Sequence, residues 1–174
     1  MRMQDMSIRV KRATVWRVDT RNSPGVLANT LGPLARAGQN LEVVIGYAYP
    51  DRVGAVIEVY PISTSAGTRA ARQAGLVRTN LPCLHVTGDN RPGLGHAIAR
   101  RLSEAGINLS FFVAQTLGPK YTGFFGFDAQ SEANLAARLL RNIDTAPTRA
   151  AERRADRAAP PQRRRRPRRS RRRA

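Results

Sequence analysis

Apolar residues alternate with polar ones along some stretches of this chain and recur at helical spacing along others. Period-two alternation is typical of strands, and an apolar stripe at every third or fourth position is typical of helices. In the first half, the pattern predicts a strand over 13–19, a helix over 26–37, strands over 41–48 and 53–60, a helix over 66–73 and a short strand over 76–78. This order, βαββαβ, predicts an antiparallel sheet with two helices on one face.

The pattern returns 68 residues later without a gap. The matched residues are Asn22 with Asn90, Pro24-Gly25 with Pro92-Gly93, Ala37-Gly38 with Ala105-Gly106, and Asn40-Leu41 with Asn108-Leu109. In the second half, a strand ending near Thr87, a helix with Pro92 in its first turn, strands over 109–117 and 121–128 and a helix over 131–143 follow in the same order. Residues 144–147 make a poor strand, so the sequence does not indicate where a fourth strand comes from.

The predicted division is an N-terminal extension over 1–12, a first domain over 13–79, a second domain over 80–146 and a disordered basic tail over 147–174.

Strand alternation assigns each apolar residue to one face of its sheet. The residues expected to face the helices of the first domain are Trp16, Val18, Leu41, Val43, Ile45, Ile57 and Val59. The opposite faces are expected to carry Val15, Val44, Val56, Tyr60, Cys83, His85, Phe112 and Phe124. Apolar faces of this kind are seldom left bare. We therefore expect them to lie at a contact between the two repeats or between two chains, most simply in a homodimer.

The paired motifs Asn22-Ser23-Pro24-Gly25…Gly38-Gln39-Asn40-Leu41 and Asp89-Asn90-Arg91-Pro92-Gly93…Gly106-Ile107-Asn108-Leu109 resemble the ACT domain, a βαββαβ regulatory module that binds amino acids. The span from residue 13 to residue 143 resembles stand-alone tandem ACT proteins, which have no catalytic domain. The resemblance implies an α+β fold of two ferredoxin-like units. It also implies ligand binding where two such domains meet, at the strand–helix loops.

The ligand residues implied by the resemblance are Asp89, Asn90, Arg91, Pro92, Gly93, Leu94 and Asn108 in the second repeat, and Asn22, Pro24, Gly25, Val26 and Asn40 in the first. The first loop departs from the family pattern because Arg21 stands where an acidic residue is expected. The chemistry agrees with a ligand site: free N–H groups at a helix start suit a carboxylate, and Asp89 or Asn108 suits an ammonium group. The alternative is that these residues only cap and terminate the helices.

Charge is concentrated at one end of the chain. Residues 149–174 contain thirteen Arg against Glu152 and Asp156, which gives +11 of the formal net charge of +18. The arginines expected to contact a polyanion such as nucleic acid are Arg163, Arg164, Arg165, Arg166, Arg168 and Arg169. The alternative is a tolerated extension with a coding bias, since Arg outnumbers Lys 28 to 2 in the whole chain.

Other site classes lack support in the sequence. Cys83 is the single cysteine, which excludes an internal disulfide, and no His or Cys stands beside it at metal-ligand spacing other than His85. No phosphate-binding glycine loop or catalytic triad spacing is evident. No signal segment or membrane span is present, so we expect a cytoplasmic protein without cofactor, metal or membrane partner.

These observations lead to one principal hypothesis and two alternatives. The principal one is a non-catalytic sensor that binds a free amino acid and signals to a partner. The alternatives are a regulatory subunit of an amino-acid biosynthetic enzyme and a nucleic-acid-binding regulator that works through the Arg-rich tail.

Overall fold

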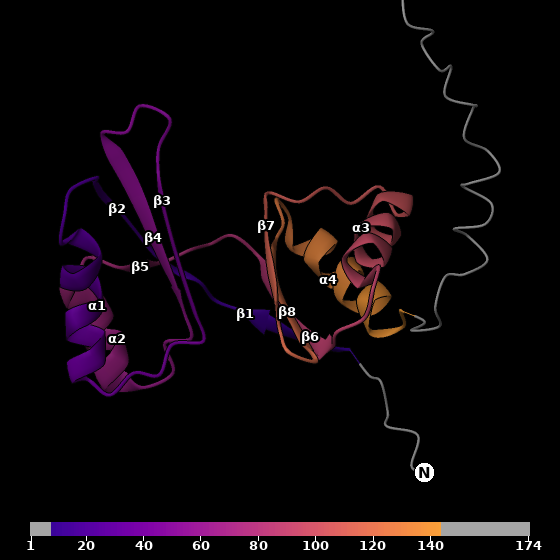
Figure 1. Cartoon of the computed structure of the whole chain (residues 1–174), viewed down its shortest axis with the longest axis horizontal. Coiled ribbons are helices and arrows are strands. Elements are labelled where there is room, and N and C mark those ends of the chain that lie inside the picture. Colours follow the sequence, from indigo (N-terminus) through magenta and orange to yellow (C-terminus); the bar gives the residue numbers. More distant parts are fainter. Residues whose placement is uncertain (1–7, 144–174) are drawn as a thin grey trace, which may run out of the picture.

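The computed structural model describes residues 8–143, which form two units of similar architecture (Figure 1). The first unit consists of β2 (Trp16–Arg21), α1 (Val26–Arg36), β3 (Val43–Ala48), β4 (Gly54–Tyr60), α2 (Ser65–Gln73) and β5 (Val77–Arg78). The second consists of β6 (Cys83–Asp89), α3 (Leu94–Glu104), β7 (Phe111–Leu117), β8 (Lys120–Gly126) and α4 (Gln130–Arg141), joined by β1 (Arg9–Ala13) from the start of the described chain.

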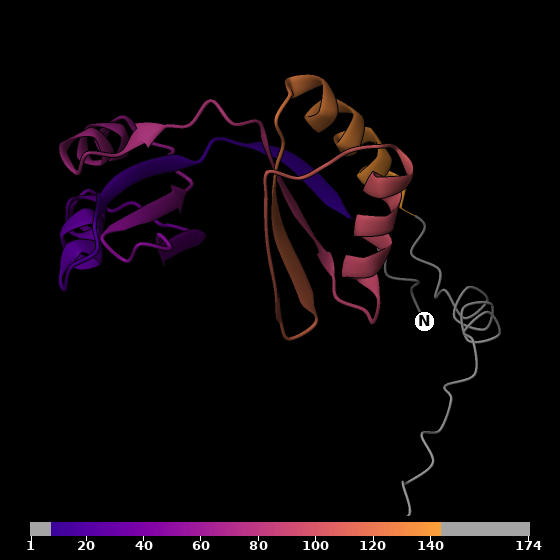
Figure 2. The ribbon, with the colours of Figure 1, turned by 90° about the horizontal axis from the view of Figure 1, so that it is seen from above.

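Each unit has one four-stranded antiparallel sheet. The strand orders are β3-β4-β2-β5 in the first sheet and β1-β6-β8-β7 in the second. Each pair of helices covers one face of its own sheet, and the uncovered faces are turned towards each other (Figures 1 and 2). The predicted α+β architecture of two ferredoxin-like units is confirmed. The predicted tail over 147–174 lies outside the described residues.

Strand β1 supplies the fourth strand that the sequence did not reveal for the second sheet. It pairs antiparallel with β6, with Arg9 opposite Thr87 and Ala13 opposite Cys83. Residues 9–12 were expected to belong to an extension, and residue 13 to begin the first strand of the first unit. The chain instead passes from one sheet to the other within two residues, Thr14 and Val15. Ile8 and Val10 alternate with Arg9 and Lys11, which is the strand pattern that this expectation overlooked.

Each unit has its own hydrophobic core between its sheet and its helices. In the first, Trp16, Leu34 and Val59 are buried with the small residues of α2. In the second, the buried cluster contains Ile8, Val10, Leu84, Val86, Leu94, Ile98, Leu102, Phe125, Phe127 and Leu140. The helical stripes predicted from the sequence are the residues that make these contacts, since Leu94, Ile98 and Leu102 are the buried positions of α3.

The assignment of side chains to the two faces of β3 and β7 was wrong, because the alternation in each strand is shifted by one residue. Val43 and Ile45 lie opposite Tyr60 and Glu58 on the uncovered face, whereas Val44 lies opposite Val59 on the helix side. In β7, Phe112 lies opposite Phe125, with ring centroids 4.9 Å apart, so it is also on the helix side. In both repeats a bend at the residue before the strand, Glu42 or Ser110, shifts the alternation.

The two units contact each other through their uncovered faces. Ala13, Val15, Cys83 and Phe124 form a third buried cluster, packed against Val43, Tyr60, Leu81 and Phe111. Phe124 therefore lies at a repeat–repeat contact, as expected for the apolar residues of this face. Val44 and Phe112, which were expected there, remain 41% and 49% exposed at the outer edges of the sheets.

Candidate functional site

The loop between β6 and α3 forms a tight turn before the helix begins. Gly93 has a left-handed conformation with φ 81° and ψ 0°, and the Leu94 N–H donates to the Arg91 carbonyl at 3.2 Å. A proline followed by a glycine of this conformation is typical of a type II turn. Pro92 was expected in the first turn of the helix, which is wrong: Gly93 is the N-cap, and the helix starts at Leu94.

The first repeat builds the same turn. Gly25 has φ 86° and ψ −14°, and the Val26 N–H donates to the Ser23 carbonyl at 3.3 Å. Few residues other than glycine adopt this conformation without strain. The repeated Pro-Gly pair is therefore accounted for by the turn in both units.

Both loops are tied to the neighbouring hairpin of their sheet. The Asn90 N–H donates to the Pro119 carbonyl at 2.7 Å, and the Asn22 N–H donates to the Val53 carbonyl at 2.8 Å. The Asn22 side chain also donates to the Arg52 carbonyl, at 3.1 Å. Asn22 therefore stabilises its loop, and the same backbone bond holds Asn90 in the second loop.

The start of α3 is open to an approaching molecule. A Cβ added to Gly93 would meet no atom within 4 Å, and the same holds for Gly25. The Leu94 side chain is buried in the core, so Leu94 offers only its backbone to a ligand. Because its N–H closes the turn, a carboxylate at this end of α3 would meet the next N–H groups, those of Gly95 and His96.

Asp89 and Asn108 do not lie together. Asp89 ends β6, and its carboxylate accepts from the Lys120 ammonium group at 2.6 Å. Asn108 follows the other end of α3, an 11-residue helix that is about 16 Å long at 1.5 Å per residue. Asn40 has the corresponding place after α1. Within one unit, a molecule as small as an amino acid cannot contact both ends of the helix.

The contact between the two units contains a polar group that the sequence analysis placed only on a sheet face. The His85 ring stacks on Phe124 with centroids 4.3 Å apart, and its Nε2 lies 2.9 Å from the Thr122 hydroxyl. Its Nδ1 lies 3.6 Å from the Glu42 carboxylate of the first unit. Burial lowers the pKa of His85, and the Glu42 carboxylate partly opposes this.

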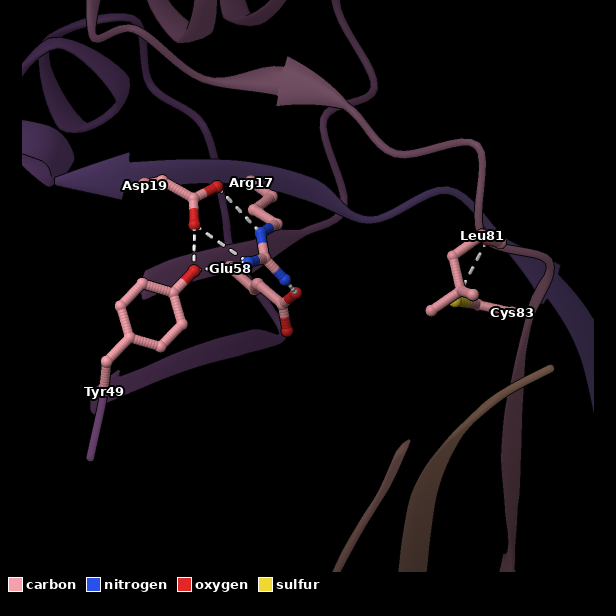
Figure 3. A network of polar contacts seen from close by, with 6 residues as sticks. All are labelled: Arg17, Asp19, Tyr49, Glu58, Leu81 and Cys83. Atoms are coloured by element: carbon pink, nitrogen blue, oxygen red, sulfur yellow. Dashed lines mark hydrogen bonds and ion pairs between the residues drawn. The ribbon is translucent and has the colours of Figure 1, made fainter. Parts of the chain in front are cut away.

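A second polar cluster lies on the uncovered face of the first sheet (Figure 3). The Arg17 guanidinium donates to Asp19 at 2.9 Å and to the Tyr49 hydroxyl at 2.8 Å, and the Tyr49 hydroxyl donates to Asp19. The hydrogen bonds from Arg17 and Tyr49 lower the pKa of Asp19 to about 2. Burial raises the pKa of the neighbouring Glu58, which Arg17 contacts at 3.5 Å. Tyr49 follows β3 in the hairpin, so strand alternation gave no sign of its part in this cluster.

Residues 8–143 were also searched for a reactive thiol, a metal site and a membrane-spanning helix. Burial raises the pKa of the Cys83 thiol to about 12, and the thiol donates to the Leu81 carbonyl (Figure 3). A thiol of this kind is a poor nucleophile at neutral pH. No group of three His, Cys, Asp or Glu within the described part of the chain is placed to hold a metal ion. None of the described helices is long and apolar enough to span a membrane.

The chain matches no family model and no curated protein sequence. Solved structures do share its fold. The regulatory subunit of aspartate kinase from Thermus thermophilus aligns with a TM-score of 0.53 and 14% identity, over 79% of this chain and 96% of that one. A structure of aspartokinase alpha and beta subunits aligns with a TM-score of 0.54 and 18% identity over the same shares.

The chain has the fold of the regulatory subunit of aspartate kinase from Thermus thermophilus. A further structure, protein BT0572 from Bacteroides thetaiotaomicron, aligns with a TM-score of 0.61 and 11% identity, over 75% of this chain and 88% of that one. This shared fold agrees with the fold that the ACT resemblance of the sequence implies. At these identities the likeness establishes the fold alone.

Proposed function

We propose that the chain is a non-catalytic regulatory protein that binds a free amino acid and signals to a partner whether the amino acid is bound. The observation that carries the proposal is the open helix start at Gly93, held by a type II turn in a fold shared with regulatory subunits. The ligand carboxylate binds backbone N–H groups at the start of α3, and its ammonium group binds an oxygen acceptor such as Asp89.

The signal is a change in the relative populations of two arrangements of the units. A ligand shifts such an equilibrium only by its difference in affinity for the two states. The contact around Phe124 and the two connections between the units, residues 14–15 and residues 79–82, are the parts of the described chain proposed to respond to such a change. The second loop is proposed as the better site, because Asp89 precedes it where Arg21 precedes the first.

The partner is proposed to be an enzyme of amino-acid biosynthesis. The similarity in fold to regulatory subunits of aspartate kinase favours this over a free-standing sensor without an enzyme partner. The charge of +11 over residues 149–174 favours a nucleic-acid partner instead. A pull-down from cell extract separates these partners, since it recovers either an enzyme or nuclease-sensitive material.

A thermal-shift screen of the full chain against the twenty amino acids tests ligand binding. A ligand at 100 times its dissociation constant adds about 2.7 kcal/mol to the free energy of unfolding. We expect one amino acid, or a chemically related group of them, to raise the melting temperature. If none does so at millimolar concentration, the proposed function is wrong.

A further inference from the structure

A cavity of about 510 Å³ lies at the end of the second sheet, beside the strand–helix loop. Its volume is in the range of small-molecule sites. The side chains that matter to its chemistry are Arg9, Thr87, Asp89, Leu117, Lys120 and Thr122. They come from β1, β6, β8 and the end of β7, so Arg9 lines the cavity only because β1 crosses to the second sheet.

Strand register places these groups on the uncovered face of the sheet. Thr87 pairs with Arg9 on one side and with Thr122 on the other, so these three side chains form one row. Asp89 pairs with Lys120 two residues further along, which puts that pair on the same face. Two hydroxyls therefore lie between an arginine on one side and an ion pair on the other.

The charges in this cavity are unbalanced. Asp89 and Lys120 form an ion pair at 2.6 Å, whereas no side-chain hydrogen bond or ion pair joins the Arg9 guanidinium to another residue within 8–143. The described residues that line the cavity thus supply two cations and one anion. The Lys120 side chain is 70% exposed and that of Asp89 33% exposed, so their ion pair is partly solvated and opens at small cost.

We propose that this cavity binds an acidic amino acid, meaning an α-amino dicarboxylate such as aspartate or glutamate. The inference rests on the proposed function and names the class of its ligand. One carboxylate pairs with Arg9, which offers a planar donor pair matched to it. The other carboxylate meets the backbone N–H groups at the start of α3, as proposed above, with the Lys120 ammonium group beside it. The ligand's ammonium group pairs with Asp89, and the Thr hydroxyls donate to the carboxylate oxygens.

Related ligands fit the charges less well. A neutral amino acid has one carboxylate for two cations, so Arg9 or Lys120 stays unmatched. A dicarboxylate without an amino group, such as succinate, has nothing for Asp89 and repels it. The cavity therefore discriminates by charge at three points, which a general attraction of anions to this basic chain does not.

Calorimetric titration of the full chain with aspartate, glutamate, asparagine, glutamine and succinate tests the inference. We expect the better of the two acids to bind at least tenfold more tightly than its amide and than succinate. Arg9→Gln and Lys120→Gln should each remove most of that preference. Lys11→Gln is the matched control, because Lys11 lies on the same face of the same strand but does not line the cavity.

The outcomes separate the inference from the proposed function. If neutral amino acids bind as well as acidic ones, or if Lys11→Gln weakens binding as much as Arg9→Gln, the inference is wrong and amino-acid binding still stands. If no amino acid binds, the proposed function fails and the inference fails with it. Melting curves of each variant, followed by circular dichroism, show whether a loss of binding comes from a loss of folding.

Discussion

At the scale of single residues, the strand–helix loops of the candidate site depend on backbone conformation more than on side chains. Gly93 and Gly25 were predicted from their spacing alone, and the structure adds the reason for glycine there, a φ near 80°. That conformation limits which residues can replace Gly93 in a binding experiment. A bulky residue such as valine at position 93 would strain the turn and confuse lost folding with lost binding. Asparagine tolerates a positive φ and still places a side chain in the open space beside the helix start.

His85 should make the stability of the folded chain depend on pH. Its pKa is lowered in the folded chain, so the folded state binds fewer protons than the unfolded state below about pH 6.5. The free energy of unfolding should therefore fall as the pH drops through that region. Glu42 and Lys11 are the charged groups that act on the ring: Glu42 reduces the effect and Lys11 increases it.

The His85→Gln variant should lose this part of the pH dependence, since glutamine does not titrate and its amide can also hydrogen-bond to the Thr122 hydroxyl. The measurement is the melting temperature of both proteins at pH 7.5 and pH 5.5. The wild type should lose more stability between these values than the variant. Equal losses would mean that His85 does not sense pH at the contact between the units.

At the scale of elements, the repeat predicted the helices and most strands, because these depend on local periodicity and on glycine and proline. The faces on which the side chains of β3 and β7 lie were not predictable in this way. Strict alternation along a strand assumes a regular backbone, and the bends at Glu42 and Ser110 interrupt it. The pairing of β1 with β6 joins residues 70 or more positions apart, such as Arg9 and Thr87. The cavity that contains Arg9 follows from that pairing, so only the loop half of the candidate site could be predicted.

Strand β1 gives a prediction about stability. Val10 is 8% exposed and packs in the second core, whereas Lys11 points to the uncovered face. Val10→Ala should reduce the free energy of unfolding by about 2 kcal/mol, and Lys11→Ala by less than about 0.5 kcal/mol.

Two probes can follow the units separately. Trp16, the single tryptophan, lies in the first core, so its fluorescence reports the first unit. In Val10→Ala, an early transition should appear in far-ultraviolet circular dichroism and not in tryptophan fluorescence. If both probes shift together or neither shifts, β1 does not stabilise the second unit selectively.

At the scale of the whole molecule, the outer edge of the second sheet supports the expected homodimer. Strand β7 is an edge strand without charged residues, and Val113 and Leu117 are 38% and 81% exposed. Uncharged edges of this length commonly pair with another chain. We expect two copies to associate through β7. Val113→Lys should then shift sedimentation from dimer to monomer while the melting curve of the monomer stays cooperative.

The choice of variant matters for this test. Phe124 is 2% exposed within the contact between the units, so an acidic residue there would disturb the chain itself. Val77→Lys is a suitable control, because Val77 is also exposed, at 64%, but lies on β5 at the far edge of the other sheet. If the wild type sediments as a monomer, or if both variants behave alike, the β7 edge is not the interface.

The central claim is that the helix start at Gly93 binds an amino acid. It is tested most directly by calorimetric titration of the full chain with the amino acid found in the screen, comparing Gly93→Asn with Gly106→Asn. Gly106 also has a positive φ, 68°, and open space around it, but it lies at the other end of α3. We predict that Gly93→Asn weakens binding at least tenfold while Gly106→Asn leaves it unchanged. Equal affinity in the two variants would contradict the account and leave the Gly93 loop with only the role of starting a helix.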